Sequence, residues 1–199
     1  MRIGSFNFGI QQDMINSKKW KNHWKELFSE VANAVIADGA LHVLFGCEVG
    51  GHKAGLSNDA LEEVSALASG AFRAKTTQNY LSAFVCRSLS PGVSLESTKH
   101  VTVPGHPSLL PQLVIDTIRV ESPGRSAYLL AGNLHIRTPS GRKAPTVSTK
   151  QRIVARALAI LSEQAASMIA GDGHEHVAQV LVGDCNLAEF QAQLAVAKV

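Results

Sequence analysis

Five polar side chains stand at or near the ends of short apolar runs in this 199-residue chain. The runs are MRIGSFNF, VLFGCEVG, AGNLHIRT and VLVGDCNL, and each has the composition of a buried strand. The polar residues that they carry are Asn7, Glu48, His135, Asp184 and Asn186. A single acid at a strand end is usually a turn residue, and a single histidine in an apolar strand is usually a core residue. Because strand ends are rigid positions, four strands that each carry such a group predict convergence on one site.

These residue types suit the hydrolysis of a phosphate ester. The carboxylates of Glu48 and Asp184 are hard oxygen donors, and magnesium needs few of them because water and substrate phosphate complete its shell. Asn7 and Asn186 offer neutral hydrogen bonds that orient a ligand without adding charge. His135 can donate a proton to a phosphate oxygen or to a leaving group. Together the five residues predict metal-assisted attack of water on a phosphate ester.

The elements that must position these residues are strands and helices of a layered domain. We expect strands at residues 1–8, 41–47, 71–75, 80–87, 100–103, 113–120, 128–136 and 177–182. Apolar spacings of three and four predict helices over 17–36 and about 57–68, and a long helix after Thr146. The apolar stripe of that last helix is Val154, Ala157, Leu158, Leu161, Ala165 and Met168. Strands clustered between helices favour an α/β fold with mixed sheets.

Composition predicts one soluble, intracellular domain. A length of 199 residues and a hydrophobic fraction of 45% are sufficient for a substantial core. The net charge of +3 is compatible with an anionic substrate but does not by itself require nucleic acid. Three cysteines without close spacing fit a reducing compartment. The N-terminus has no signal-peptide pattern, and no uninterrupted apolar run approaches the ~20 residues of a spanning helix.

In the order in which they occur, MRIGSFNF, VLFGCEVG, GNLHIRT and VLVGDCNL resemble the motifs of the endonuclease/exonuclease/phosphatase family, the group of pancreatic deoxyribonuclease. VLVGDCNL is similar to its Gly-Asp-x-Asn signature, and GNLHIRT to its Asn-x-His-Leu strand. VLFGCEVG is similar to its strand that ends in Gln-Glu, with Cys47 in place of Gln. The resemblance covers residues 1–187. It implies a DNase I-like four-layer α/β sandwich, in which two packed mixed sheets flanked by helices form a single domain over residues 1–199.

The resemblance also implies a role for each residue. Glu48 would be the principal metal ligand, and Asn7 beside it would help to place the metal or the phosphate. His135 would contact the scissile phosphate or assist the leaving group. Asp184 would orient or deprotonate the attacking water, and Asn186 would bond a phosphate oxygen. The cofactor would be magnesium or manganese.

The chain departs from the family pattern after its Gly-Asp-x-Asn signature. The family continues into further strands and a Ser-Asp-His motif, whose histidine is central to catalysis. The tail LAEFQAQLAVAKV contains neither His nor Asp. His174 and His176 are expected at the opposite end of the last strand, so they would not substitute. We therefore expect an incomplete C-terminal part: a fragment of a longer product, a site completed by another chain, or a degenerate relative. Loss of one member of a catalytic unit can remove most of the rate.

The predicted function is a divalent-metal-dependent phosphoesterase, with a nuclease favoured. The loop RTPSGRK after His135 carries Arg137, Arg142 and Lys143, which suit either a phosphate backbone or a solvated loop. Two alternatives stay open. One is a phosphatase or sphingomyelinase-like hydrolase of a small or lipid phosphoester. The other is a truncated, non-catalytic binding module of the same fold. The partner would be nucleic acid or another phosphoester, and the sequence does not identify protein partners.

Overall fold

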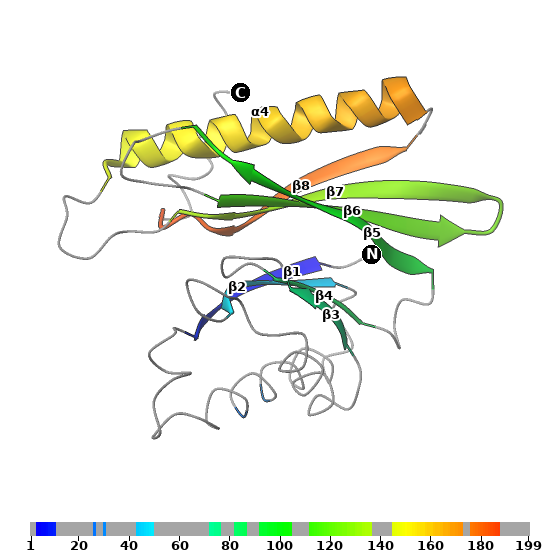
Figure 1. Cartoon of the computed structure of the whole chain (residues 1–199), viewed down its shortest axis with the longest axis horizontal. Coiled ribbons are helices and arrows are strands. Elements are labelled where there is room, and N and C mark those ends of the chain that lie inside the picture. Colours follow the sequence, from blue (N-terminus) through cyan, green and yellow to red (C-terminus); the bar gives the residue numbers. More distant parts are fainter. Residues whose placement is uncertain are drawn as a thin grey trace. The chain divides into compact units, whose positions relative to one another are not determined.

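A computed structural model of the chain describes residues 3–10, 26, 30, 43–49, 72–76, 82–86, 92–104, 112–136, 145–172 and 176–187. The chain divides into two compact units, Met1–Val93 and Ser94–Val199, each of which contains one sheet (Figure 1). The helices predicted over 17–36 and 57–68 lie outside the described residues, apart from Glu26 and Glu30, which are helical.

The first unit contains a mixed four-stranded sheet with the order β1-β2-β4-β3. Its strands are β1 (Ile3–Ile10), β2 (Val43–Val49), β3 (Phe72–Thr76) and β4 (Ser82–Cys86). β1 and β2 are parallel, whereas β4 is antiparallel to both β2 and β3. Val43 and Phe45, two residues apart on β2, are fully buried, as the period of a strand requires for one apolar face.

The second unit contains a mixed four-stranded sheet with the order β5-β6-β7-β8. Its strands are β5 (Val93–Thr102), β6 (Gln112–Ser122), β7 (Arg125–His135) and β8 (Val177–Asp184). β6 and β7 form an antiparallel hairpin, and β8 is parallel to β7. Pro123 and Gly124 close the hairpin, and the φ of +80° at Gly124 is the left-handed geometry that such turns require at their second central residue.

The long helix α4 (Val147–Asp172) covers one face of the second sheet (Figure 1). Thr146 caps it, because its Oγ1 accepts a hydrogen bond from the Thr149 N–H at 3.2 Å and its carbonyl accepts one from the Lys150 N–H at 3.1 Å. The predicted apolar stripe is confirmed at five of its six residues, which are buried: Val154, Ala157, Leu161, Ala165 and Met168. Leu158 is half-buried and packs against this core, and Ile153, which the stripe did not include, is buried in it.

By length and composition alone, α4 is also the one described helix that could cross a membrane. One face of α4 packs against the sheet, the other face is exposed, and charged residues interrupt its apolar sequence. The charged residues of α4 are Lys150, Arg152, Arg156 and Glu163, with Asp172 at its end.

All eight predicted strands are present, with boundaries that differ by a few residues. The largest difference is β5, which was expected to begin at residue 100 and begins at Val93. Its first residues, VSLESTK, are largely polar because β5 is an edge strand with several exposed side chains. The expectation of mixed sheets is confirmed within each unit. The four-layer arrangement and the single domain over 1–199 stay predictions.

Candidate functional site

Asn7 and Glu48 lie toward the carboxyl ends of two neighbouring parallel strands. In the β1–β2 register Asn7 is opposite Cys47, so Glu48 follows one residue further along β2. The register shifts beyond Asn7 before Ile10 pairs with Val49, and irregularities of this kind are frequent beside functional sites. The backbone therefore brings the two predicted metal-site residues to the same end of the first sheet. Their carboxylate and amide oxygens are ligand types that magnesium accepts.

His135 and Asp184 are direct partners in the parallel pairing of β7 with β8. Paired residues of neighbouring strands place their side chains on the same face of a sheet, so the imidazole and the carboxylate share a face. His135 is only 7% exposed and its Nε2 is shielded from solvent, whereas Asp184 is half-buried. His135 and Asp184 are thus far apart in the sequence but lie together at one end of the second sheet.

The turn after β8 fixes the Asp184 carboxylate. The N–H of Asn186 donates to Oδ1 of Asp184 at 2.8 Å, which is the bond of an Asx turn. Asn186 has a φ of 48°, a left-handed value that asparagine tolerates better than most residues. Its Nδ2 donates to the carbonyl of Ile136 at 2.8 Å, and the Ile136 N–H donates to the carbonyl of Asp184 at 2.9 Å. The turn is therefore hydrogen-bonded to the residue that follows β7.

Gly183 permits the close approach of β8 to β7 immediately before Asp184. Its φ is +123°, and a Cβ at this position would lie 2.1 Å from the carbonyl oxygen of Leu134. No residue with a side chain fits there without a shift of the backbone. The glycine of the GDCN sequence is therefore a geometric requirement of the strand that carries Asp184.

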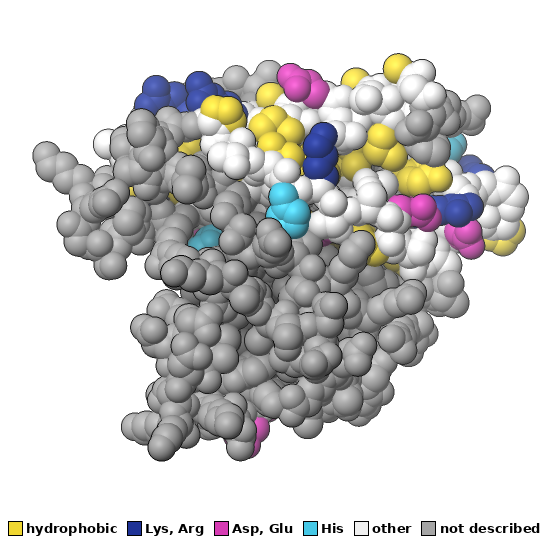
Figure 2. Space-filling model, in the orientation of Figure 1, with side chains coloured by type: hydrophobic (Ala, Val, Ile, Leu, Met, Phe, Trp, Pro, Cys, Tyr) yellow, Lys and Arg dark blue, Asp and Glu magenta, His cyan; other side chains and the backbone are white. Residues whose placement is uncertain are grey.

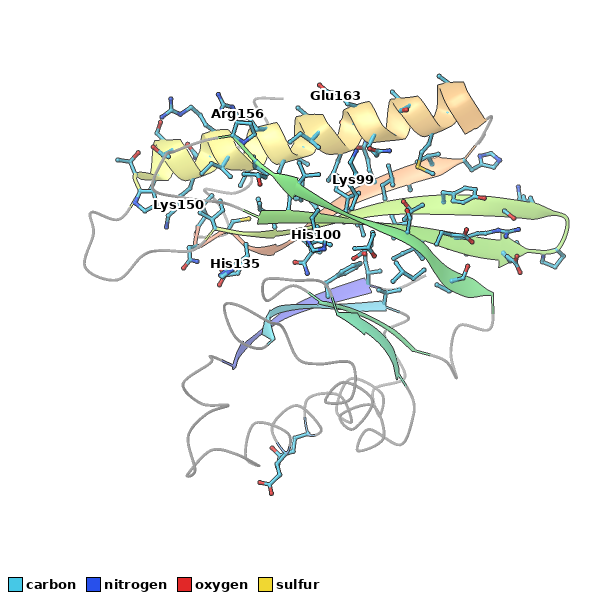
Figure 3. All side chains as sticks on the ribbon, viewed as in Figure 1. Lys99, His100, His135, Lys150, Arg156 and Glu163 are labelled. Carbon is cyan, nitrogen blue, oxygen red and sulfur yellow. The ribbon has the colours of Figure 1, made fainter. Side chains whose placement is uncertain are left out.

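Lys150 also contacts this turn, and sequence reasoning did not find it. Its Nζ donates to the carbonyl of Asn186 at 2.6 Å, although the two residues are far apart in the chain. Figure 3 shows Lys150 and His135 at the same end of the second unit, with Glu163 further along α4. The sequence contained one indication of this contact. A lysine in the first turn of a helix is repelled by the positive end of the helix dipole, so a hydrogen-bond acceptor in another element favours its position.

The buried acid Asp116, bonded to the half-buried Thr98, lies in the same sheet. Asp116 is 1% exposed, and its Oδ1 accepts a hydrogen bond from the Thr98 Oγ1 at 2.6 Å. Asn133, also 1% exposed, precedes His135 by two residues on β7 and shares its face. Sequence reasoning missed Asp116, although an acid inside the apolar run QLVIDTIRV was a visible signal. Buried polar groups of this kind hold their surroundings in one arrangement when they are hydrogen-bonded.

Cys185, within the same turn, is not suited to act as a nucleophile. Burial raises the pKa of its thiol from 9.0 to about 11, and the neighbouring charge of Asp184 adds to the effect. The thiol therefore stays protonated at neutral pH, and only the thiolate is nucleophilic. The side chain packs against the core under α4 instead.

Several predicted residues are not placed in this site. Arg137, Arg142 and Lys143 lie outside the described residues, as does His174. The carbonyl of His176 accepts a hydrogen bond from the Tyr128 N–H at 2.8 Å. His176 therefore lies at the end of β8 opposite to Asp184, as expected. Within the ranges that the structure describes, no three His, Cys, Asp or Glu side chains form a cluster that could hold a metal ion.

No protein-family model and no curated protein matches this sequence. Solved structures do match its fold. The mannosyl-6-phosphatase of Bacteroides thetaiotaomicron is similar with a TM-score of 0.62 and 12% identity, over 98% of this chain and 70% of that one. ANGEL2, a 2',3'-cyclic phosphatase in complex with adenosine-2',3'-vanadate, has a TM-score of 0.57 and 16% identity, over 93% and 53%. TDP2 of D. rerio, complexed with single strand DNA product, has a TM-score of 0.50 and 12% identity, over 98% and 64%.

The fold is DNase I-like. This agrees with the fold that the motif resemblance implies, and at such low identities it is the fold alone that the similarity shows. The chain spans 68%, 64% and 48% of the length of three TDP2 structures.

Proposed function

We propose that this chain is a divalent-metal-dependent phosphoesterase of the endonuclease/exonuclease/phosphatase family that hydrolyses phosphodiester bonds of nucleic acid. The observation that carries the proposal is the pairing of His135 with Asp184 at the end of two parallel strands, with the carboxylate held by the Asn186 N–H at 2.8 Å. An acid and an imidazole on one face can serve as the general base and the general acid in the hydrolysis of a phosphate ester. The DNase I-like fold supports the same chemistry, because two of the similar proteins are phosphatases.

The groups of the second unit would divide the chemistry between them. Asp184, fixed by its turn, orients the attacking water and accepts a proton from it. His135 donates a hydrogen bond to the phosphate or a proton to the leaving group. The Nδ2 of Asn186 carries two hydrogens, one of which bonds the Ile136 carbonyl, and the second would bond a phosphate oxygen.

Glu48 and Asn7 would hold the metal ion. They fit magnesium or manganese by their oxygen donors and by their place at one end of two parallel strands. The bound ion would supply charge neutralisation at the phosphate and a lower pKa for its water.

Nucleic acid is the substrate class that we favour. Figure 2 shows Lys and Arg side chains gathered over the first turns of α4, where Arg152 and Arg156 are exposed. α4 begins at the same end of the second unit as His135 (Figure 3). Positive side chains beside a phosphoesterase site suit a polyanionic backbone, and they predict affinity that falls with salt. One similar structure, TDP2 of D. rerio, contains a single strand DNA product.

A small phosphomonoester is the second candidate substrate. The mannosyl-6-phosphatase of Bacteroides thetaiotaomicron, at a TM-score of 0.62, is more similar in fold than the DNA-bound TDP2 structure, at 0.50. For either substrate we propose a soluble intracellular protein, because the sparse cysteines fit a reducing compartment and the apolar face of α4 packs on the second sheet.

The test compares hydrolysis of single-stranded DNA, plasmid DNA and mannose 6-phosphate in the presence of magnesium or manganese. We expect cleavage of DNA, and a loss of kcat of about 100-fold or more in Glu48→Gln and in Asp184→Asn, the scale of removing a group of a catalytic unit. Glu163→Gln, an exposed position on α4 (Figure 3), is the matched control and should retain full activity.

Each other outcome selects an alternative. Hydrolysis of mannose 6-phosphate without cleavage of DNA would favour the second candidate. Binding of DNA without hydrolysis of any substrate would favour a binding module. Activity that survives both Glu48→Gln and Asp184→Asn unchanged would falsify the assignment of the site.

A further inference from the structure

We propose that Lys150 is a positioning residue for the Asp184 carboxylate and that it acts through the main chain of Asn186. The importance of this tether for catalysis rests on the proposed function, whereas the tether itself does not.

The contact runs from α4 to the carboxylate in two hydrogen bonds. The Nζ of Lys150 donates to the carbonyl of Asn186 at 2.6 Å, and the N–H of Asn186 donates to Oδ1 of Asp184 at 2.8 Å. A bond from an ammonium group to a carbonyl is charge-assisted and stronger than a neutral one. Lys150 therefore restrains the same residue whose N–H orients the carboxylate.

The turn needs such a restraint because its backbone is held in a sparsely populated conformation. Asn186 has a φ of 48°, which costs free energy even for asparagine and persists only where surrounding contacts fix it. Two hydrogen bonds link Asn186 to neighbouring elements: its side-chain Nδ2 donates to the Ile136 carbonyl, and its main-chain carbonyl accepts from the Nζ of Lys150. Removal of the ammonium group leaves Asn186 with the side-chain bond of this pair but without the main-chain one.

The place of Lys150 on its helix also favours a specific role over an ordinary solvated lysine. Lys150 lies in the first turn of α4, which contains no acidic residue. A positive charge there opposes the helix dipole, so the position is unfavourable for α4 itself. Lys150 is half-buried, and its ammonium group donates to the Asn186 carbonyl at the surface of the second unit. The lysine thus stabilises the turn at the expense of the helix that carries it.

Because Lys150 is unfavourable for α4 but stabilises the turn, its replacement can distinguish a positioning role from a purely structural one. Lys150→Met keeps most of the apolar length of the side chain but removes the charge and the donor. Because the helix loses an unfavourable charge while the turn loses a hydrogen bond, the two effects oppose each other and the melting temperature should change little. Protection of the Asn186 amide against hydrogen exchange should fall about tenfold or more, the scale of one hydrogen bond to a charged group. In the proposed reaction kcat should fall by a similar factor of about ten while KM changes less than about twofold.

Two variants serve as controls. Lys150→Arg keeps a charged donor and should restore both the protection of the Asn186 amide and most of kcat. Lys99→Met removes an ammonium group that bonds Oε1 of Gln164 at 3.2 Å, further along α4, and should change neither (Figure 3). Exchange is followed by NMR on the ¹⁵N-labelled full chain, and hydrolysis on the same samples with single-stranded DNA and magnesium.

The outcomes separate failure of this proposal from failure of the proposed function. Unchanged protection of the Asn186 amide in Lys150→Met overturns the tether, whatever the activity. Lost protection with unchanged kcat overturns the positioning role. If the wild-type chain hydrolyses no phosphoester, the proposed function fails, and the exchange measurement alone decides whether the tether exists.

Discussion

At the scale of residues, two unusual backbone conformations frame the Asp184 carboxylate. Gly183 has a φ of +123° and Asn186 a φ of 48°, and both values belong to the region that L-residues with large side chains avoid. The first brings β8 against the backbone of β7, and the second turns an N–H back to Oδ1 of Asp184. In the Gly-Asp-x-Asn pattern, the glycine and the asparagine thus adopt the backbone conformations that hold the Asp184 carboxylate in place.

Gly183→Ala should destabilise the protein strongly. The added Cβ would lie 2.1 Å from the Leu134 carbonyl oxygen, which is backbone and cannot rotate away. We expect the free energy of unfolding to fall by about 3 kcal/mol from strain and overpacking combined. Gly124→Ala is the matched control, because its φ is +80° and no atom lies within 4 Å of the added Cβ. It should cost about 1 kcal/mol. Urea denaturation measures both, and equal losses would contradict the contact with β7.

Sequence reasoning identified the residues of this end of the sheet but not all of their contacts. His135 and Asp184 could be paired because each ends an apolar run, and the ends of parallel strands meet. The contact of Lys150 with Asn186 could not be predicted, because it depends on where the first turn of α4 lies over the sheet. The burial of Asp116 depends in the same way on the packing of β6 between two neighbours.

At the scale of elements, prediction succeeded where burial imposes a period on the sequence. The stripe of α4 and the apolar runs of β6 and β7 follow the periods of a helix and of buried strands, and all three elements are present. The first half of β5 was missed because an edge strand with exposed side chains imposes no apolar pattern. The ends of α4 are governed instead by its caps, which a stripe does not locate.

Thr146→Ala should destabilise α4 at its first turn. The Oγ1 of Thr146 accepts the Thr149 N–H at 3.2 Å and lies 3.0 Å from the Thr149 hydroxyl, so its loss leaves an amide of the first turn without its cap. We expect the free energy of unfolding to fall by about 1 kcal/mol. Thr146→Ser retains the oxygen and should cost little. Urea denaturation at an unchanged m-value tests the pair, and the assignment of the cap fails if serine and alanine cost the same.

At the scale of the whole molecule, the proposed roles are divided between the two units of the chain. The proposed metal ligands, Asn7 and Glu48, belong to Met1–Val93, and His135 and Asp184 belong to Ser94–Val199. Each pair lies at one end of a mixed sheet of its own unit. Because the two roles are carried by residues of different sheets, substitution can test metal binding and acid–base chemistry separately.

The division of roles predicts that the melting temperatures of Glu48→Gln and His135→Gln respond differently to metal. A ligand that binds only the folded chain at ten times its Kd stabilises that chain by about 1.4 kcal/mol. Magnesium or manganese should therefore raise the melting temperature of the wild-type chain and of His135→Gln, and a chelator should reverse the rise. Glu48→Gln should show no such rise, because it lacks the principal oxygen ligand. Hydrolysis should be lost in both variants.

The melting temperature of each variant with metal is compared with its own value without metal, so any loss of stability from replacing the buried His135 cancels. A rise in Glu48→Gln equal to that of the wild type would place the metal elsewhere, and a missing rise in His135→Gln would join the two roles in one cluster.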